Sequence, residues 1–212
     1  MKKVTYILIV FSLLMSIPNR SAYADVAPPE TVPGSNINPE SESTQVRMVA
    51  ESVTLTISED LTDENGAVAE TRAVFTMRNL GTVEESMAVR FPLSFLYADL
   101  GGFPEIESIV VKVDGKTAST KREIQPFKNS EIPWAVFDLT FPPGQDVLIE
   151  VVYNVDGYGY YPYQAFKYIL ETGAGWNGTI GSAEIIVRLP YEVSEQNLDL
   201  SGQAGHGETR CV

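Results

Sequence analysis

The chain has 212 residues and a formal net charge of −13 at pH 7, from 15 basic and 28 acidic side chains. A chain this acidic has no electrostatic footprint for nucleic acid or anionic lipid, so we expect neither as a partner. It holds one cysteine and one histidine, which excludes an intramolecular disulfide and leaves too few ligands for a structural zinc site.

The first 24 residues have the layout of a secretory signal peptide. Lys2 and Lys3 precede an apolar run over 6–14, and the tripeptide Ala-Tyr-Ala at 22–24 supplies a cleavage site. Cleavage near Ala24 leaves 12 basic and 28 acidic residues, a charge of −16. We therefore expect an extracytoplasmic protein (secreted, periplasmic or on the cell surface) with no membrane span in the mature chain, and an anchor beyond the polar end stays an open alternative.

The mature chain divides by composition into three parts. Residues 25–45 are rich in Pro, Ser and Glu and predict a flexible leader. Residues 194–212 are polar and rich in Gly, which predicts a tail. Between them, apolar residues alternate with polar ones, as in strands with one buried face. The segments that alternate in this way are 53–57, 73–77, 87–91, 109–113, 135–141, 147–155, 166–170 and 183–189.

Turn residues separate these segments. Asp114-Gly115 is a strong hairpin signal, and the sequence Pro-Pro-Gly-Gln-Asp at 142–146 turns the chain between two apolar runs. No stretch outside the signal peptide has helical periodicity. The sequence therefore predicts an all-β fold over 46–193, an antiparallel immunoglobulin-like β-sandwich of about eight strands, with a closed barrel as the second choice.

The order of these motifs resembles a known pattern. An Arg-Asn-x-Gly turn at 78–81 is followed by a strand end Phe-Pro-Leu at 91–93, a Val-Asp-Gly hairpin at 113–115, and the segment 168–178 around Trp176. This combination resembles bacterial exported proteins of a domain-of-unknown-function family. It is also similar to the N-terminal domain of inter-alpha-trypsin inhibitor heavy chains and vault-associated proteins. The resemblance implies a sandwich and an interaction domain, and it supplies no catalytic residue.

Glycines at 173, 175 and 178 have the G-x-G-x-x-G spacing of a dinucleotide-binding loop. Such a loop needs a helix at its end to hold the phosphate, whereas an alternating strand pattern follows this one. We therefore expect no nucleotide and no other cofactor. The glycines are instead expected to allow positive φ in an inter-strand loop, with Trp176 folded back as an apolar plug. If the loop binds anything, Trp176 is the candidate.

A tyrosine-rich segment over 153–168 supplies the other candidates for a binding surface. Tyr158, Tyr160 and Tyr161 lie beside two glycines in a turn-like stretch and are expected to be exposed. Such rings suit sugar stacking or protein contact. The alternative, in which these rings plug one end of the sandwich, is favoured over an exposed binding surface. Together with Trp176 they form the predicted binding surface.

No metal or catalytic site is predicted. The acidic stretch 59–65 fails as an EF-hand loop because Leu61 and Arg72 fall at ligand positions, so an acidic hairpin loop is favoured and an irregular calcium site stays open. His206 lies in the glycine-flanked tail, which is unsuited to a catalytic triad. Cys211 is interpreted as an exposed thiol, with pairing to another chain as the alternative.

These observations favour a non-catalytic, exported binding or scaffold domain of the bacterial cell envelope that contacts another protein. One alternative is a carbohydrate-binding module that uses the exposed aromatic residues. A second is a carboxylate-based envelope hydrolase, which would need two carboxylates in a cleft, although no pair in the sequence stands out.

Overall fold

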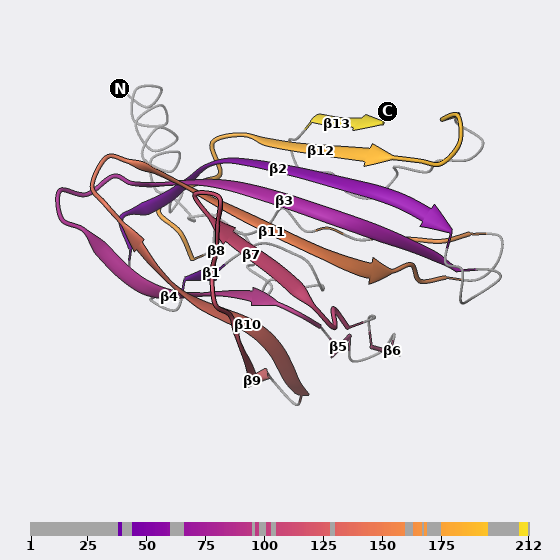
Figure 1. The fold of residues 1–212 in the computed structure, drawn as a ribbon, viewed down its shortest axis with the longest axis horizontal. Helices are drawn as coiled ribbons and strands as arrows, with labels where there is room; N and C mark the ends of the chain where they lie inside the picture. Colours follow the sequence, from indigo (N-terminus) through magenta and orange to yellow (C-terminus); the bar gives the residue numbers. More distant parts are fainter. Residues whose placement is uncertain are drawn as a thin grey trace, which may run out of the picture.

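The computed structural model describes residues 38–39, 44–59, 66–94, 96–97, 101–102, 105–127, 130–159, 163–166, 168, 175–194 and 208–211. The regular secondary structure of these residues consists of strands, in agreement with the predicted all-β class. Figure 1 shows a larger sheet that runs along the long axis of the molecule and a smaller sheet beside it. The predicted leader and tail fall largely outside the described residues.

The larger sheet has seven strands, in the order β13-β12-β2-β3-β11-β7-β8. Their bounds are β2 Val46–Glu59, β3 Ala67–Asn79, β7 Ile109–Val113, β8 Lys116–Thr117, β11 Asp146–Asp156, β12 Ala183–Arg188 and β13 Glu208–Cys211. The smaller sheet has the order β1-β4-β10-β9, and β5 pairs with β6. Their bounds are β1 Asn38–Pro39, β4 Glu85–Pro92, β5 Leu96–Tyr97, β6 Gly101–Gly102, β9 Lys121–Phe127 and β10 Ser130–Phe141.

Most neighbouring strands are antiparallel, as predicted, but one edge of the larger sheet is not. Strand β12 pairs with β2 in parallel, and β13 pairs with β12 in parallel. The connection after β11 carries the chain back to the beginning of β2, so β12 starts at the same end as β2 and must run beside it in the same direction. Strand β13 also lies within the segment that the sequence predicts to be a tail. The immunoglobulin-like arrangement stays a prediction.

Most of the strand predictions are confirmed. Seven of the eight predicted segments lie in strands, in β2, β3, β4, β7, β10, β11 and β12. The prediction for 166–170 is wrong for its described residues: Phe166 and Tyr168 lie outside any strand and pack against the core. Strand β9 was not predicted, because its charged residues and Pro126 obscure any alternation.

Alternate residues of the long strands build one core between the sheets. On β3 the buried side chains include Ala73, Phe75 and Met77, and the intervening residues face outward. The smaller sheet contributes Phe91 and Phe141, both fully buried. This period-2 burial is the physical basis of the alternation in the sequence.

The predicted hairpin at Asp114-Gly115 is confirmed. Both residues have positive φ, 48° and 77°, which is the geometry of a type I′ turn and suits the twist of the strands β7 and β8. The Asp114 carboxylate also accepts a hydrogen bond from the Leu148 amide at 2.9 Å, so the turn is fastened to β11.

Asn79 explains the Arg-Asn-x-Gly motif. Its side chain is fully buried and donates to the carbonyl oxygens of Val83 at 2.7 Å and Phe141 at 2.9 Å. Its carboxamide oxygen accepts from the Gly81 amide at 2.8 Å, and its backbone carbonyl accepts from Gly144 at 2.8 Å. One residue thus joins the β3–β4 turn to the β10–β11 turn. The Arg-Asn-x-Gly motif therefore has a structural role, because Asn79 stabilises both turns.

Replacing Asn79 by Ala is expected to lower the free energy of unfolding by about 3 kcal/mol, because three side-chain hydrogen bonds are lost and buried partners stay unsatisfied. Asn79→Asp should cost at least as much at neutral pH, since a carboxylate cannot donate to two carbonyls. Urea unfolding measures both. Leu80→Ala is the control, because Leu80 is 52% exposed. Equal stability of the Asn79 and Leu80 variants would contradict this role.

Candidate interaction surfaces

Trp176 lies in the core. Only 6% of its surface is exposed, and its ring meets Phe141 edge-on with the centroids 5.9 Å apart. The buried position of Trp176 therefore agrees with the expectation that it folds back as an apolar plug. A ring buried in this way presents almost no surface to a stacking ligand, so Trp176 does not extend a binding surface formed by the tyrosines.

The glycine-rich loop that contains Trp176 lies along the first half of β2. The Asn177 amide donates to the Val46 carbonyl at 2.8 Å, and the Gly181 amide donates to the Met48 carbonyl at 3.1 Å. A Cβ atom at Gly181 would lie 2.3 Å from the Val49 carbonyl oxygen. Gly178 has a φ of 71°. A strand, β12, follows the loop, as expected. Gly181 thus permits the close approach of the loop to the β2 backbone, and Gly178 permits a left-handed backbone conformation.

Gly181→Ala is expected to destabilise the protein by about 3 kcal/mol. The new methyl group would overlap the Val49 carbonyl, at the point where the register of β2 shifts between Met48 and Ala50. Gly178→Ala should cost only about 1 kcal/mol, since its Cβ would meet open space and only the left-handed conformation is unfavourable. Thermal unfolding of the two variants measures the difference. A cost at Gly181 no larger than at Gly178 would contradict the close approach.

The tyrosine-rich segment is divided between surface and core. Tyr158 is half-buried and exchanges backbone hydrogen bonds of 3.1 and 2.8 Å with Ala165. Tyr160 and Tyr161 lie outside the described residues. Tyr163, which the sequence did not single out as exposed, has 76% of its surface exposed. It lies inside the turn that the bridge between Tyr158 and Ala165 closes.

Two other tyrosines of this segment fit the alternative, in which the rings plug the sandwich. Tyr153 is buried on β11 against Phe91, with ring centroids 5.5 Å apart, and burial raises the pKa of its hydroxyl. The Tyr168 hydroxyl donates to the Glu51 carboxylate at 2.6 Å. Glu51 is only 2% exposed. Burial first, and then the charge of Glu51, raise the pKa of Tyr168 well above its ordinary value. The pair fastens the β11–β12 connection onto β2.

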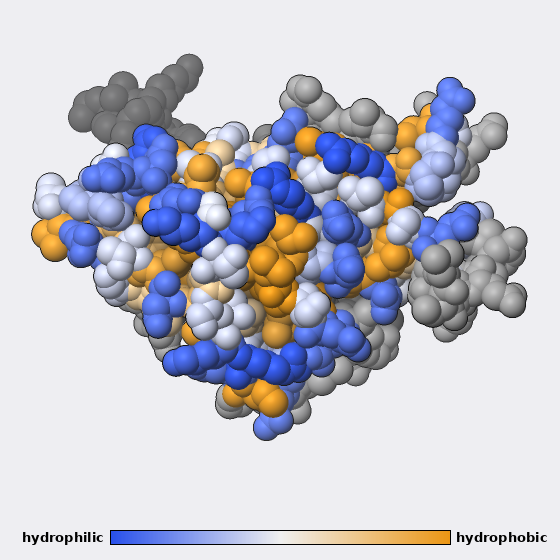
Figure 2. Space-filling model, viewed as in Figure 1, coloured by the Kyte–Doolittle hydropathy of each residue, from blue (hydrophilic) through white to orange (hydrophobic). Residues whose placement is uncertain are grey.

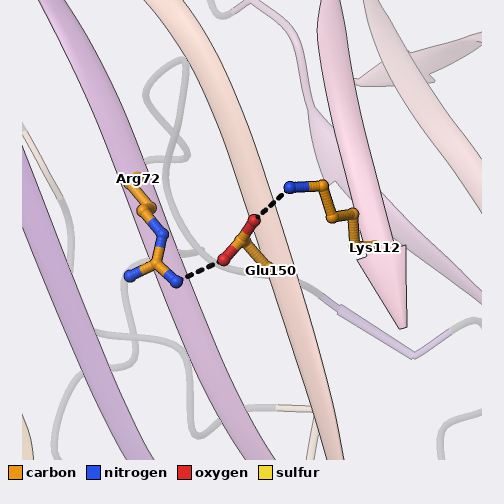
Figure 3. A network of polar contacts seen from close by, with 3 residues as sticks. All are labelled: Arg72, Lys112 and Glu150. Atoms are coloured by element: carbon orange, nitrogen blue, oxygen red, sulfur yellow. Dashed lines mark hydrogen bonds and ion pairs between the residues drawn. The ribbon is translucent and has the colours of Figure 1, made fainter. Parts of the chain in front are cut away.

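The outward side of β3, β11 and β7, which we call the outer face, carries charged side chains in ion pairs. Glu150 on β11 bridges Arg72 on β3 and Lys112 on β7, with the Lys112 Nζ at 2.8 Å (Figure 3). The hydrogen bond from Lys112, followed by that from Arg72, holds the pKa of Glu150 below its ordinary value despite partial burial.

A third ion pair lies on the same face. Arg78 donates two hydrogen bonds to the Asp146 carboxylate, at 2.5 and 2.7 Å, and these bonds lower the pKa of Asp146. The two residues are directly opposite each other on β3 and β11. Such bidentate pairs hold long side chains in one geometry. The basic side chains Arg72, Arg78 and Lys112 are therefore held along the sheet surface by acidic residues of the same face.

Apolar side chains lie between these ion pairs. Val110 and Leu148 are 48% and 47% exposed, and Val74 and Val152 are half-buried beside them. Val110 is directly opposite Val152 across β7 and β11. In the view of Figure 2, hydrophobic residues form islands separated by hydrophilic ones instead of one continuous patch. Alternation in the sequence identifies the core side of each strand and gives no signal for a binding surface on the opposite side.

Several predicted features stay untested. The acidic stretch 60–65 and His206 lie outside the described residues, and nothing is described of the side chain of Cys211. Among the residues that are described, no group of three His, Cys, Asp or Glu side chains could hold a metal ion. Those residues also form no helix that is long and apolar enough to cross a membrane.

No protein-family model and no curated protein matches the chain. Among solved structures, it is similar to a Legionella pneumophila protein named "putative nutrient binding protein", with a TM-score of 0.56 and 23% identity over 69% of this chain. The chain spans 50% of that protein. At this identity the likeness shows the fold alone, an all-β fold of mostly antiparallel sheets. The resemblance to an exported family stays a prediction.

Two further solved structures show weaker similarity. A two domain M1 zinc metallopeptidase matches with a TM-score of 0.34 and 12% identity, over 75% of this chain and 35% of the other. The native yeast LTA4 hydrolase matches with a TM-score of 0.31 and 12% identity, over 68% of this chain and 18% of the other. Similarities at this level carry no argument about function.

Proposed function

We propose that this chain is an exported, non-catalytic binding domain of the bacterial cell envelope and that its partner is another protein. The observation that carries the proposal is the outer face of the larger sheet, where exposed Val110 and Leu148 lie between ion pairs. The signal-peptide layout of residues 1–24 supports export. The similar Legionella protein is also named for binding, in its case of a nutrient.

The composition of the outer face suits a protein partner. Protein interfaces combine apolar contacts with polar side chains around them, and they are depleted in unpaired charge at their centre. Here Glu150 neutralises Arg72 and Lys112 in part, so a partner that covers Val110 and Leu148 meets paired charges. The backbone beneath is a hydrogen-bonded sheet, so little conformational entropy is lost when it is covered.

A photo-crosslinking amino acid placed at Leu148, in protein expressed in a bacterial cell, tests this face. We expect one discrete protein adduct from position 148 and none from Val83, which is more exposed, at 73%, but lies in the β3–β4 turn. Adding Val110→Asp should reduce the adduct severalfold, because a charge would lie where apolar contact is needed. No adduct, or equal adducts from both positions, would contradict the proposal.

Export is tested separately in the same cells. Fractionation should place the protein outside the cytoplasm, and mass spectrometry should find its N-terminus at Asp25. An uncleaved cytoplasmic protein would remove the envelope context from the proposal while leaving the outer face to be judged by the crosslinks.

A carbohydrate-binding module is the second candidate, and the exposure of Tyr163 favours it. A flat, accessible ring offers a stacking surface for a sugar. Tyr163→Ala should then lower retention of the protein on peptidoglycan at least about tenfold, whereas Tyr191→Ala, at a 51% exposed position, should not, since a lost aromatic stacking contact is worth a large part of a weak affinity. Equal retention of both variants would remove this candidate.

A further inference from the structure

Asn177 and Gly178, in the loop that precedes β12, form a dipeptide that the fold leaves open to chemical change. An asparagine followed by glycine can deamidate without an enzyme, because the glycine amide nitrogen and the side-chain carbonyl carbon, Cγ, are held close together by the chain itself. Asparagine is one of the thermolabile residues of proteins. Whether a given asparagine reacts in a folded protein depends on whether the fold occupies or blocks these two groups.

The attacking group, the backbone amide of Gly178, is free. Among the described residues it donates to no acceptor, whereas the amides of Asn177 and Gly181 on either side of it donate to carbonyls of β2. Gly178 is exposed, and a Cβ atom at this position would have no neighbour within 4 Å. A glycine in open space places no steric obstacle in front of the reacting nitrogen.

The group that is attacked, the side chain of Asn177, is restrained by one printed contact at the surface. Its Nδ2 donates to the Oε1 of Gln45 at 3.2 Å, which is at the long end for a hydrogen bond of this type. Such an exposed bond opens locally at little cost in free energy. The side chain can then turn its Cγ toward the amide of Gly178.

Two other asparagines show what protection the fold can give. Asn79 is fully buried with three side-chain hydrogen bonds, and the amide of the following Leu80 donates to a backbone carbonyl at 3.0 Å. Asn154 lies in β11, where the following Val155 is part of the ladder with β3. A β-branched residue in an extended strand hinders ring closure by its bulk. Of these three asparagines, Asn177 alone is followed by a glycine with a free amide.

We propose that Asn177 is a site of spontaneous deamidation in the folded protein. The Gly178 nitrogen loses its proton to hydroxide and forms a bond to the Asn177 Cγ, while the side-chain NH2 takes up a proton from water and leaves as ammonia. Water then opens the resulting succinimide ring at one of its two carbonyls. One opening gives aspartate, and the other gives isoaspartate, in which the backbone runs through the side-chain carbon. The net reaction consumes one water and releases one ammonia.

The two products differ in their effect on the loop. Aspartate keeps the backbone unchanged, and Gln45 can turn its amide to donate to the new carboxylate. Isoaspartate lengthens the backbone by one carbon between Trp176, which is buried in the core, and Gly181, which lies against Val49. The extra carbon strains a loop that is anchored on both sides. Isoaspartate therefore loosens the connection that places β12 beside β2.

Incubation of the mature protein, residues 25–212, at mildly alkaline pH, followed by digestion in acid and mass spectrometry, tests the proposal. We expect the peptide that contains Asn177 to gain the mass that replacement of NH2 by OH gives, as both aspartate and isoaspartate. Its rate should be no less than about one tenth of that in a synthetic peptide of residues 173–182, because one surface hydrogen bond slows the reaction about tenfold at most. The rate should rise with pH, since hydroxide removes the amide proton.

Peptides that contain Asn79 and Asn154 should stay unmodified in the same samples, and the other Asn-Gly pair, at 65–66, is scored in a peptide of its own. Two results would overturn the proposal. One is an unmodified Asn177 in the folded protein while the synthetic peptide reacts. The other is aspartate without isoaspartate, because direct hydrolysis of the side chain would then account for the product.

Matched variants identify the attacking group. Gly178→Ala keeps Asn177 but puts a methyl group beside the attacking nitrogen, so it should slow the modification about tenfold or more. Asn177→Gln should abolish it over the same period, because the longer side chain would have to close a six-membered ring. Thermal unfolding shows that each variant is folded. A Gly178→Ala variant that reacts as fast as the unchanged protein overturns the attack by the Gly178 amide.

The effect on the loop is measured on separated products. The isoaspartate form, purified from the incubated protein, should unfold a few degrees below the unmodified form. Asn177→Asp, which carries the same charge on an unchanged backbone, should unfold at nearly the temperature of the unmodified protein. Equal unfolding temperatures of the isoaspartate form and Asn177→Asp would show that the loop tolerates the extra carbon, and would overturn the loosening of β12.

Discussion

The return of the chain to the start of β2 is the constraint on which the larger sheet depends. Trp176 enters the core, Gly181 lies against the β2 backbone, and Tyr168 donates to buried Glu51. These contacts fix the β11–β12 connection along β2, so β12 can pair with β2 only in parallel. Trp176, which the sequence offers as a candidate for ligand binding, and the nearby Gly178 and Gly181 are therefore used to close the sheet.

Because the core takes one face of each strand, the opposite faces are free to carry function. Val110 and Leu148 can be exposed without cost to the core, since their strand neighbours Val111 and Ile149 are the residues that it buries. Glu150 holds Arg72 and Lys112 along the sheet and neutralises part of their positive charge. The outer face is thus a product of one-sided burial.

The parts of the fold that can be predicted from the sequence are those that leave a local pattern of apolar residues. Alternation marks β2, β3, β10 and β11 because each buries one complete face. The same rule misassigns Phe166 and Tyr168, whose apolar bulk packs on the core without strand pairing. It also misses β9, whose residues 121–124 are all exposed and so leave no apolar period. Parallel pairing and exposure of Tyr163 depend on contacts between distant segments, which no local pattern records.

The selectivity of the outer face has a physical basis in its paired charges. A flat face of this kind selects by shape and apolar contact, because its ion pairs are already satisfied within the chain.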